Sequence, residues 1–102
     1  LNIASEKSAY TITDRATYLA TRKNLSLDIL VEGDPALLNI YHVIVVNPQK
    51  SDKINNAGAL AFADFMISTQ AQEVIRTFGV SEFGQPLFFP DADKTEADLG
   101  SV

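Results

Sequence analysis

The residues from Ala9 to Arg22 place a strand-like run directly before a helix-like run, and this junction restricts how the chain can fold. Residues 10–13, Tyr-Thr-Ile-Thr, alternate in polarity as a β-strand does. Residues 14–17, Asp-Arg-Ala-Thr, suit the first turn of a helix, with Thr13 or Asp14 as the N-cap. A strand is therefore expected to lead straight into the start of a helix.

Arg15 is an unusual residue for the first turn of a helix. A cation there opposes the helix dipole, at a cost of about 0.3–1 kcal/mol when it is exposed. We therefore expect Arg15 to have a partner, either an acidic side chain or a bound anion. In the first case Thr13 and Asp14 only cap the helix. In the second, the free N–H groups of the first turn hold a small anion, with hydroxyl groups from Thr11, Thr13 and Thr17 as further donors.

Two further strand-like runs indicate the fold class. Residues 27–32 follow the first helix, and the order strand, helix, strand usually gives parallel strands with a right-handed crossover. Residues 40–46, Ile-Tyr-His-Val-Ile-Val-Val, are apolar on both faces, which suits a strand covered by helices on both sides. The sequence therefore predicts an α/β fold with a mixed or parallel sheet flanked by helices.

Helical signals dominate the second half of the chain. Residues 57–66 have the 3.6-residue apolar period of a helix, which Asn55 or Asn56 is expected to cap. A second helix is expected to begin at Ser68-Thr69, where Thr69 to Gln72 fits a capping box, and to stop at Gly79.

The two ends of the chain carry weaker signals. Residues 1–8 read as the end of a helix followed by a turn. Residues 83–90 are rich in aromatic and turn residues and are expected to pack extended across the core. Residues 91–102 are acidic and non-periodic, so we expect a frayed polar tail.

Composition excludes several classes of function. The 102 residues suffice for one domain with a modest core. The net charge is −5 and the eight basic residues are scattered, so the electrostatic footprint of a nucleic-acid or anionic-lipid binder is missing. The absence of cysteine excludes disulfides and thiolate metal sites. Small oxyanions remain compatible, because a local set of N–H groups can bind them in an acidic protein.

No motif indicates an enzyme or a metal cation site. The one histidine, His42, lies in the most apolar run and is expected to pack in the core, which leaves no hydrolase triad. The acidic residues lack the spacing of a calcium loop, and neither GxGxxG nor GxxxxGK[ST] occurs. We therefore expect no catalytic residues and no cofactor.

An ordered set of motifs resembles the C-terminal part of the tungstate-binding proteins of bacterial ABC importers. The resemblance covers roughly residues 1–90 and continues through Ala61 and Phe62 into the expected helix pair. The motifs are AYTITDRATYL at 9–19, LVEGDP at 30–35, VIVVNP at 43–48 and FGQPLF at 83–88.

The resemblance implies a partial fold of the periplasmic-binding-protein type, made of C-terminal pieces of two α/β lobes. Residues 1–39 would form a second-lobe segment. Residues 40–90 would form a crossing strand and a helix pair that return to the first lobe, and residues 91–102 the tail. By the same resemblance Thr11 is an anion ligand, with Tyr10, Thr13 and Arg15 as neighbouring contributors.

The implied function is to bind tungstate, molybdate or a similar tetrahedral oxyanion and deliver it to a membrane permease. The implied location is periplasmic or extracellular, either free or lipid-anchored. The family's Thr/Ser-rich first strand and Ser-Arg-Gly-Asp segment are absent, so we expect the chain to be part of a longer polypeptide. We expect it to pair with the missing N-terminal lobe or with a second copy. The alternative is a sensory or self-association module that keeps this fold and binds no anion.

Overall fold

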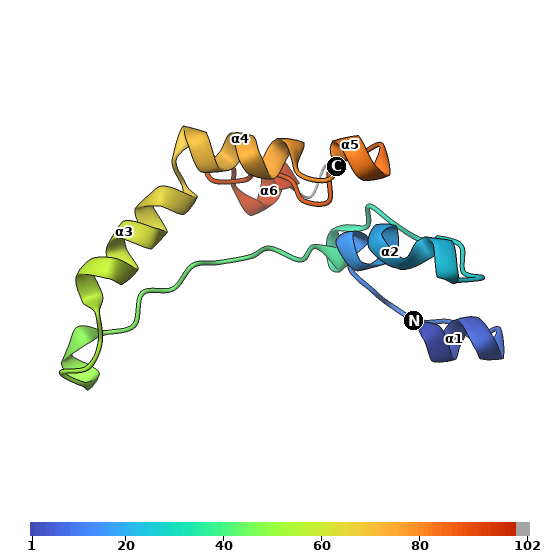
Figure 1. Ribbon diagram of the computed structural model, residues 1–102, viewed down its shortest axis with the longest axis horizontal. Coiled ribbons are helices and arrows are strands. Elements are labelled where there is room, and N and C mark those ends of the chain that lie inside the picture. The colour runs from blue at the N-terminus through green and yellow to red at the C-terminus, as the bar shows by residue number, and fades with distance from the viewer. Residues whose placement is uncertain (100–102) are drawn as a thin grey trace.

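The computed structural model describes residues 1–99, which trace an elongated path of 50 × 28 × 28 Å. The radius of gyration is 17.4 Å, whereas a compact chain of this length has about 13 Å. Helices α3, α4 and α5 follow one another along one side, and a long extended segment leads from the region of α2 back to the start of α3 (Figure 1). The path therefore brings few side chains together into a common interior.

Residues 1–99 contain six α-helices and three 3₁₀ helices, and no β-strand. Their bounds are α1 Asn2–Lys7, α2 Arg15–Thr21, η1 Arg22–Asn24, η2 Pro35–Leu37, η3 Pro48–Lys50, α3 Asn56–Met66, α4 Thr69–Thr77, α5 Val80–Phe83 and α6 Glu96–Leu99.

The starts of α2 and α3 confirm one of the two caps predicted for each helix. The Asp14 carboxylate accepts a hydrogen bond from the backbone N–H of Thr17 at 2.9 Å, so Asp14 is the N-cap of α2. The side-chain oxygen of Asn55 accepts from the N–H of Gly58 at 2.9 Å and caps α3. Each side chain satisfies an N–H group that has no partner within its own helix.

The capping box predicted for α4 is wrong. The N-cap is Ser68, whose hydroxyl accepts from the N–H of Ala71 at 3.2 Å. Thr69 is the first helical residue instead of the cap. The Gln72 side chain donates to the carbonyl of Met66 at 2.8 Å, so it braces the α3–α4 junction. The helix begins at Ser68-Thr69 as predicted, but the first of these two hydroxyl residues is the cap instead of the second.

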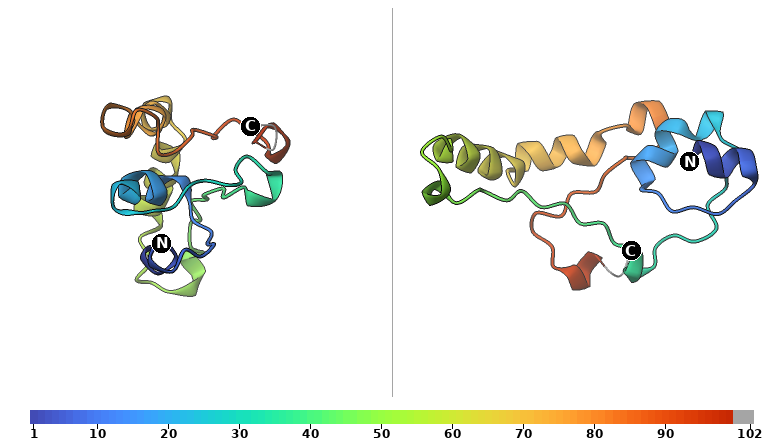
Figure 2. Two further views of the ribbon diagram at one scale, coloured as in Figure 1. Left: turned by 90° about the vertical axis from the view of Figure 1, so that its right-hand side faces the viewer. Right: turned by 90° about the horizontal axis from the view of Figure 1, so that it is seen from below.

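The three segments predicted as strands do not form a sheet in the described residues. Residues 10–13, 27–32 and 40–46 have no strand assignment, and no backbone hydrogen bond joins any two of them. Residues 40–46 lie in a long unpaired path between η2 and η3 (Figures 1 and 2). A strand needs a neighbouring strand to pair its N–H and C=O groups. None of the three segments lies beside another as such a neighbour. The expected sheet is therefore not confirmed.

The buried core of residues 1–99 is limited to Ala4, Leu19, Ala71 and Leu87. The accessible surface is 8195 Å², against about 5,700 Å² for a compact protein of this mass. Residues 40–46 account for part of this excess, since Ile44 is 83% exposed. His42 is also exposed, so its predicted place in the core is wrong.

The residues after α4 make a long-range apolar contact that involves aromatic stacking. Phe88 lies between Phe78 and Tyr41, with ring centroids 6.4 and 6.0 Å away. The N–H of Leu87 donates to the carbonyl of Phe78 at 3.1 Å. The segment 83–90 thus folds back on the end of α4, although its first residue belongs to α5.

Part of the expected polar tail is helical. Residues 96–99 form α6, whereas residues 91–95 lie outside any helix. The remainder of the predicted tail, residues 100–102, lies outside the described residues.

Gly79 and Gly84 make a matched pair for testing how Leu87 packs. Both have positive φ, 87° and 78°, so alanine at either position costs about 1–2 kcal/mol of backbone strain. A Cβ at Gly79 would lie 2.7 Å from Cγ of Leu87, whereas a Cβ at Gly84 would meet nothing within 4 Å. We expect Gly79→Ala to lower the free energy of unfolding by about 1–3 kcal/mol more than Gly84→Ala, as overpacking does. Chemical denaturation measures both, and equal losses would contradict this packing.

The exposed apolar surface predicts that residues 1–102 produced alone will self-associate. Ile44 and Leu30 are 83% and 71% exposed and are two of many large apolar side chains that residues 1–99 leave exposed, and such surface favours association. Size-exclusion chromatography with light scattering should show dimers or larger species that dissociate at low concentration. A stable monomer as compact as a typical 102-residue domain would contradict the prediction.

Candidate anion-binding site

The residues predicted for the anion site all lie in or beside the segment that enters α2. Thr11 and Thr13 are exposed, Tyr10 is 89% exposed, and the side chain of Arg15 is 36% exposed. None of them is sealed in an apolar interior. The structure therefore places the four residues in sequence along one accessible segment, without enclosing them in a pocket.

Two open hollows in the described residues lie away from this segment. The larger has a volume of about 580 Å³, and its lining residues are Pro35, Leu38, Ile40, His42, Glu96 and Ala97. The other lies between α4 and residues 90–94. Neither contains a predicted site residue.

The three threonine hydroxyls proposed as donors differ in availability. The Thr17 hydroxyl donates to the Asp14 carboxylate at 2.7 Å, so the cap uses it. The Thr13 hydroxyl makes a long hydrogen bond of 3.4 Å to the carbonyl of Asp14. The Thr11 hydroxyl has no hydrogen-bond partner within residues 1–99. Thr11 is therefore the threonine of this segment that is best able to bind an external acceptor.

Asp14 places a negative charge at the start of α2. The hydrogen bond from the Thr17 backbone N–H, followed by that from the Thr17 hydroxyl, lowers the pKa of the Asp14 carboxyl. The carboxylate therefore occupies the helix start that an external anion would need. Of the two interpretations of this junction, the structure shows the capping one, and an anion beside it has to rely on donors other than the α2 amides.

Arg15 has the acidic partner that its position predicted. Nη2 of Arg15 lies 3.3 Å from Oε2 of Glu32, and Nη1 donates to Oε1 of Gln85 at 3.5 Å. The guanidinium also lies over the ring of Phe89, 5.5 Å from its centroid, which is within the range of a cation–π contact. The salt bridge offsets the unfavourable position of a cation in the first turn of α2.

Sequence reasoning did not identify Glu32, Gln85 or Phe89 as partners of Arg15. They lie 17, 70 and 74 positions away in the chain, so no local pattern connects them to Arg15. The position of Arg15 in the first turn of α2 indicated that it needs a negatively charged partner. It did not indicate where in the chain that partner lies.

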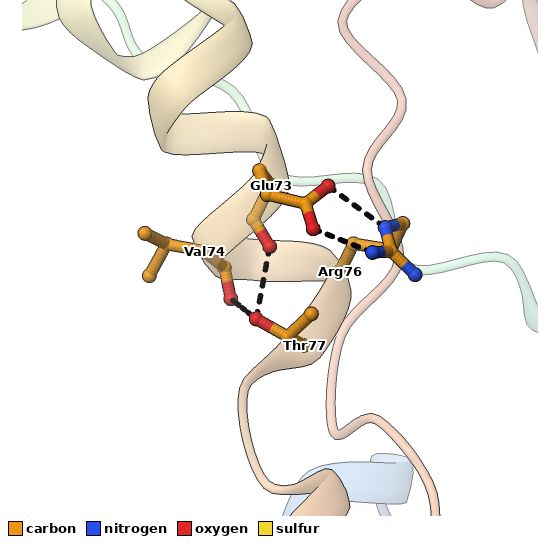
Figure 3. Close-up of polar contacts among 4 residues, drawn as sticks. All are labelled: Glu73, Val74, Arg76 and Thr77. Atoms are coloured by element: carbon orange, nitrogen blue, oxygen red, sulfur yellow. Dashed lines mark hydrogen bonds and ion pairs between the residues drawn. The ribbon is translucent and has the colours of Figure 1, made fainter.

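A second polar cluster lies on the exposed face of α4 (Figure 3). Arg76 Nε donates to Glu73 Oε2 at 2.9 Å, and the hydrogen bonds from Arg76 lower the pKa of the Glu73 carboxyl. The Thr77 hydroxyl donates to the carbonyls of Glu73 and Val74. All these contacts join residues one turn apart, so the cluster supports the helix locally. Within residues 1–99, no group of three or more potential ligand side chains is placed to hold a metal ion.

The cap at Asp14 predicts a specific pH dependence of stability. Because the pKa of Asp14 is lowered in the folded state, its stabilising effect is complete above the ordinary value of 3.8 and is lost as pH falls through the lower folded-state pKa. Asp14→Ala should cost about 0.5–2 kcal/mol at pH 7 and less than that near pH 2. Denaturant unfolding between pH 2 and 7 measures the difference.

The matched control for Asp14 is Asp28→Ala, since the Asp28 carboxylate accepts no hydrogen bond within residues 1–99. Its cost should be small at both ends of the pH range. If Asp14→Ala costs the same at pH 2 as at pH 7, the Asp14 carboxylate does not cap α2 as an anion.

Comparison with known proteins places the chain in a family. Residues 1–70 match the family described as a PBP superfamily domain. The tungstate-binding protein TupA of Peptoclostridium acidaminophilum is 49% identical over 92% of the chain and 33% of its own length. TupA of Campylobacter jejuni is 35% identical over 96% of the chain and 37% of its own length.

A protein of Haloferax volcanii proposed to be an ABC transporter anion-binding protein is 43% identical, over 95% of the chain and 29% of its own length. The chain thus spans about a third of the length of the curated relatives it matches. No solved structure matches the chain significantly. The match over residues 1–70 shows that this chain belongs to the PBP superfamily domain family, and it is similar to tungstate-binding proteins of the TupA type.

Proposed function

We propose that the full-length protein containing this chain is the solute-binding component of an ABC importer and that it binds tungstate or a similar tetrahedral oxyanion such as molybdate. The observation that carries the proposal is the 49% identity to a tungstate-binding protein over 92% of the chain. A second relative, proposed to be an anion-binding protein of an ABC transporter, supports the same class of ligand. The relatives are binding proteins by name, which favours a role without catalysis and without a cofactor.

In this proposal Thr11 is the principal ligand residue that the chain supplies, and Tyr10, Thr13 and Arg15 contribute beside it. A tetrahedral dianion removed from water needs several N–H and O–H donors, because unpaired charge is costly to bury. Thr11 has an exposed hydroxyl that is free of partners within residues 1–99, so it meets this need without adding charge. The remaining donors would come from polypeptide outside residues 1–99. This agrees with the coverage of the relatives, since the chain spans about a third of their length.

The partners in this proposal are the oxyanion, a membrane permease, and a first lobe that covers the exposed apolar residues of the chain. The excess of accessible surface in residues 1–99 supports such a covering partner. The protein would act in the periplasm or outside the cell, either free or lipid-anchored. None of the helices within residues 1–99 has the length and apolar character needed to cross a membrane.

Isothermal titration of the full-length protein with tungstate, molybdate and sulfate tests the proposal. We expect heat with tungstate, and Thr11→Val should weaken binding by about 10- to 150-fold, because it removes one hydrogen bond to a charged ligand worth about 1.5–3 kcal/mol. Thr11→Ser keeps the hydroxyl and should retain most of the affinity.

The matched control is Thr21→Val, since the Thr21 hydroxyl donates to the Thr17 carbonyl within α2. This variant should bind tungstate as the wild type does. Absence of heat with all three oxyanions would reject the proposal in favour of a sensory or self-association module that binds no anion.

A further inference from the structure

The guanidinium of Arg15 joins three segments that are far apart in the chain. Glu32 lies at the end of residues 27–32, whereas Gln85 and Phe89 lie in the segment that folds back after α5. Residues 1–39 and 83–90 thus meet at one side chain. Because the guanidinium has a fixed planar geometry, contacts in two of its N–H directions and on its face restrict its orientation.

The position of Arg15 in α2 links this orientation to the proposed anion site. Arg15 is the first residue of α2, and residues 10–13 lead directly into it. Those residues make no backbone hydrogen bond to another part of residues 1–99, so nothing in their own backbone holds them in place. Beside the local cap of Asp14, the contacts of Arg15 are therefore a restraint near Thr11 that comes from distant parts of residues 1–99.

We propose that Gln85 and Phe89 are positioning residues for the anion site and act on it through Arg15. This inference rests on the proposed function, since it concerns the same site. Gln85 accepts a hydrogen bond from Nη1 at 3.5 Å, and Phe89 presents its ring face to the cation at 5.5 Å. Neither residue needs to touch the anion. Both restrict the guanidinium, which restricts the start of α2 and the segment that carries Thr11.

A double-mutant cycle in the full-length protein separates action through Arg15 from a direct effect. Phe89→Leu should weaken tungstate binding by about 2- to 5-fold, the size expected for an exposed cation–π contact of about 0.5–1 kcal/mol. In an Arg15→Met background the same substitution should have no further effect, since the charge that Phe89 contacts is absent. Gln85→Ala should behave in the same way.

Phe88→Leu is the matched control, because the ring contacts of Phe88 are with Tyr41 and Phe78 instead of Arg15. Its effect on binding should be the same in the wild-type and Arg15→Met backgrounds. If the effect of Phe89→Leu is also equal in the two backgrounds, Phe89 does not act through Arg15 and the inference is overturned.

Amide hydrogen exchange without any oxyanion gives a readout that is independent of binding. Phe89→Leu and Gln85→Ala should speed exchange of the two hydrogen-bonded amides at the start of α2, Thr17 and Tyr18, when Arg15 is present, and Phe88→Leu should leave it unchanged. If the wild-type protein binds none of the oxyanions, the proposed function fails, while exchange still decides whether the two residues hold this segment. Unchanged exchange in both variants would overturn the inference whether or not tungstate binds.

Discussion

Backbone pairing is the constraint on which the rest of this structure depends. A helix satisfies its N–H and C=O groups within itself, whereas an extended segment needs a neighbour. Residues 40–46 have apolar side chains on both faces and no neighbouring strand within residues 1–99, so they cross the molecule unpaired and exposed. Because a sheet would also have been the surface against which the helices pack, its absence leaves almost no core. The small number of buried residues and the elongated shape both follow from the missing strand pairing within residues 1–99.

The same constraint separates what the sequence could predict from what it could not. The caps at Asp14 and Asn55 and the turn at Gly79 were predictable because each depends on contacts within about four residues. The start of α4 at Ser68-Thr69 was predictable in the same way, but the capping residue was misassigned to Thr69, since both residues carry a hydroxyl that can cap. The apolar pattern of the three strand-like segments shows that each suits a sheet. Whether a segment pairs depends on a neighbouring strand, and the pattern within the segment does not identify that neighbour.

Arg15 shows how far a local argument reaches toward a site. The unfavourable position of a cation in the first turn predicted a partner, and the salt bridge to Glu32 confirms that one exists. Nothing local indicated Gln85 or Phe89, because those contacts arise only when the chain folds back after α5. The roles of Tyr10, Thr11 and Thr13 stay predictions, since the structure shows their exposure and not what they bind.

The charges around the start of α2 explain why an anion there would need more than these residues. Asp14 caps the helix and Glu32 pairs with Arg15, so the local charge is negative in spite of the cation. A guanidinium has five N–H donors, of which the contacts to Glu32 and Gln85 use two, so donors remain even though the charge of Arg15 is paired with that of Glu32. Affinity for an oxyanion in such surroundings has to come from aligned donors such as the Thr11 hydroxyl and from exclusion of water, since hydrogen bonds gain strength as the local dielectric falls. In the proposed site, residues 10–15 supply donors to the anion, and enclosing the anion would require atoms outside residues 10–15.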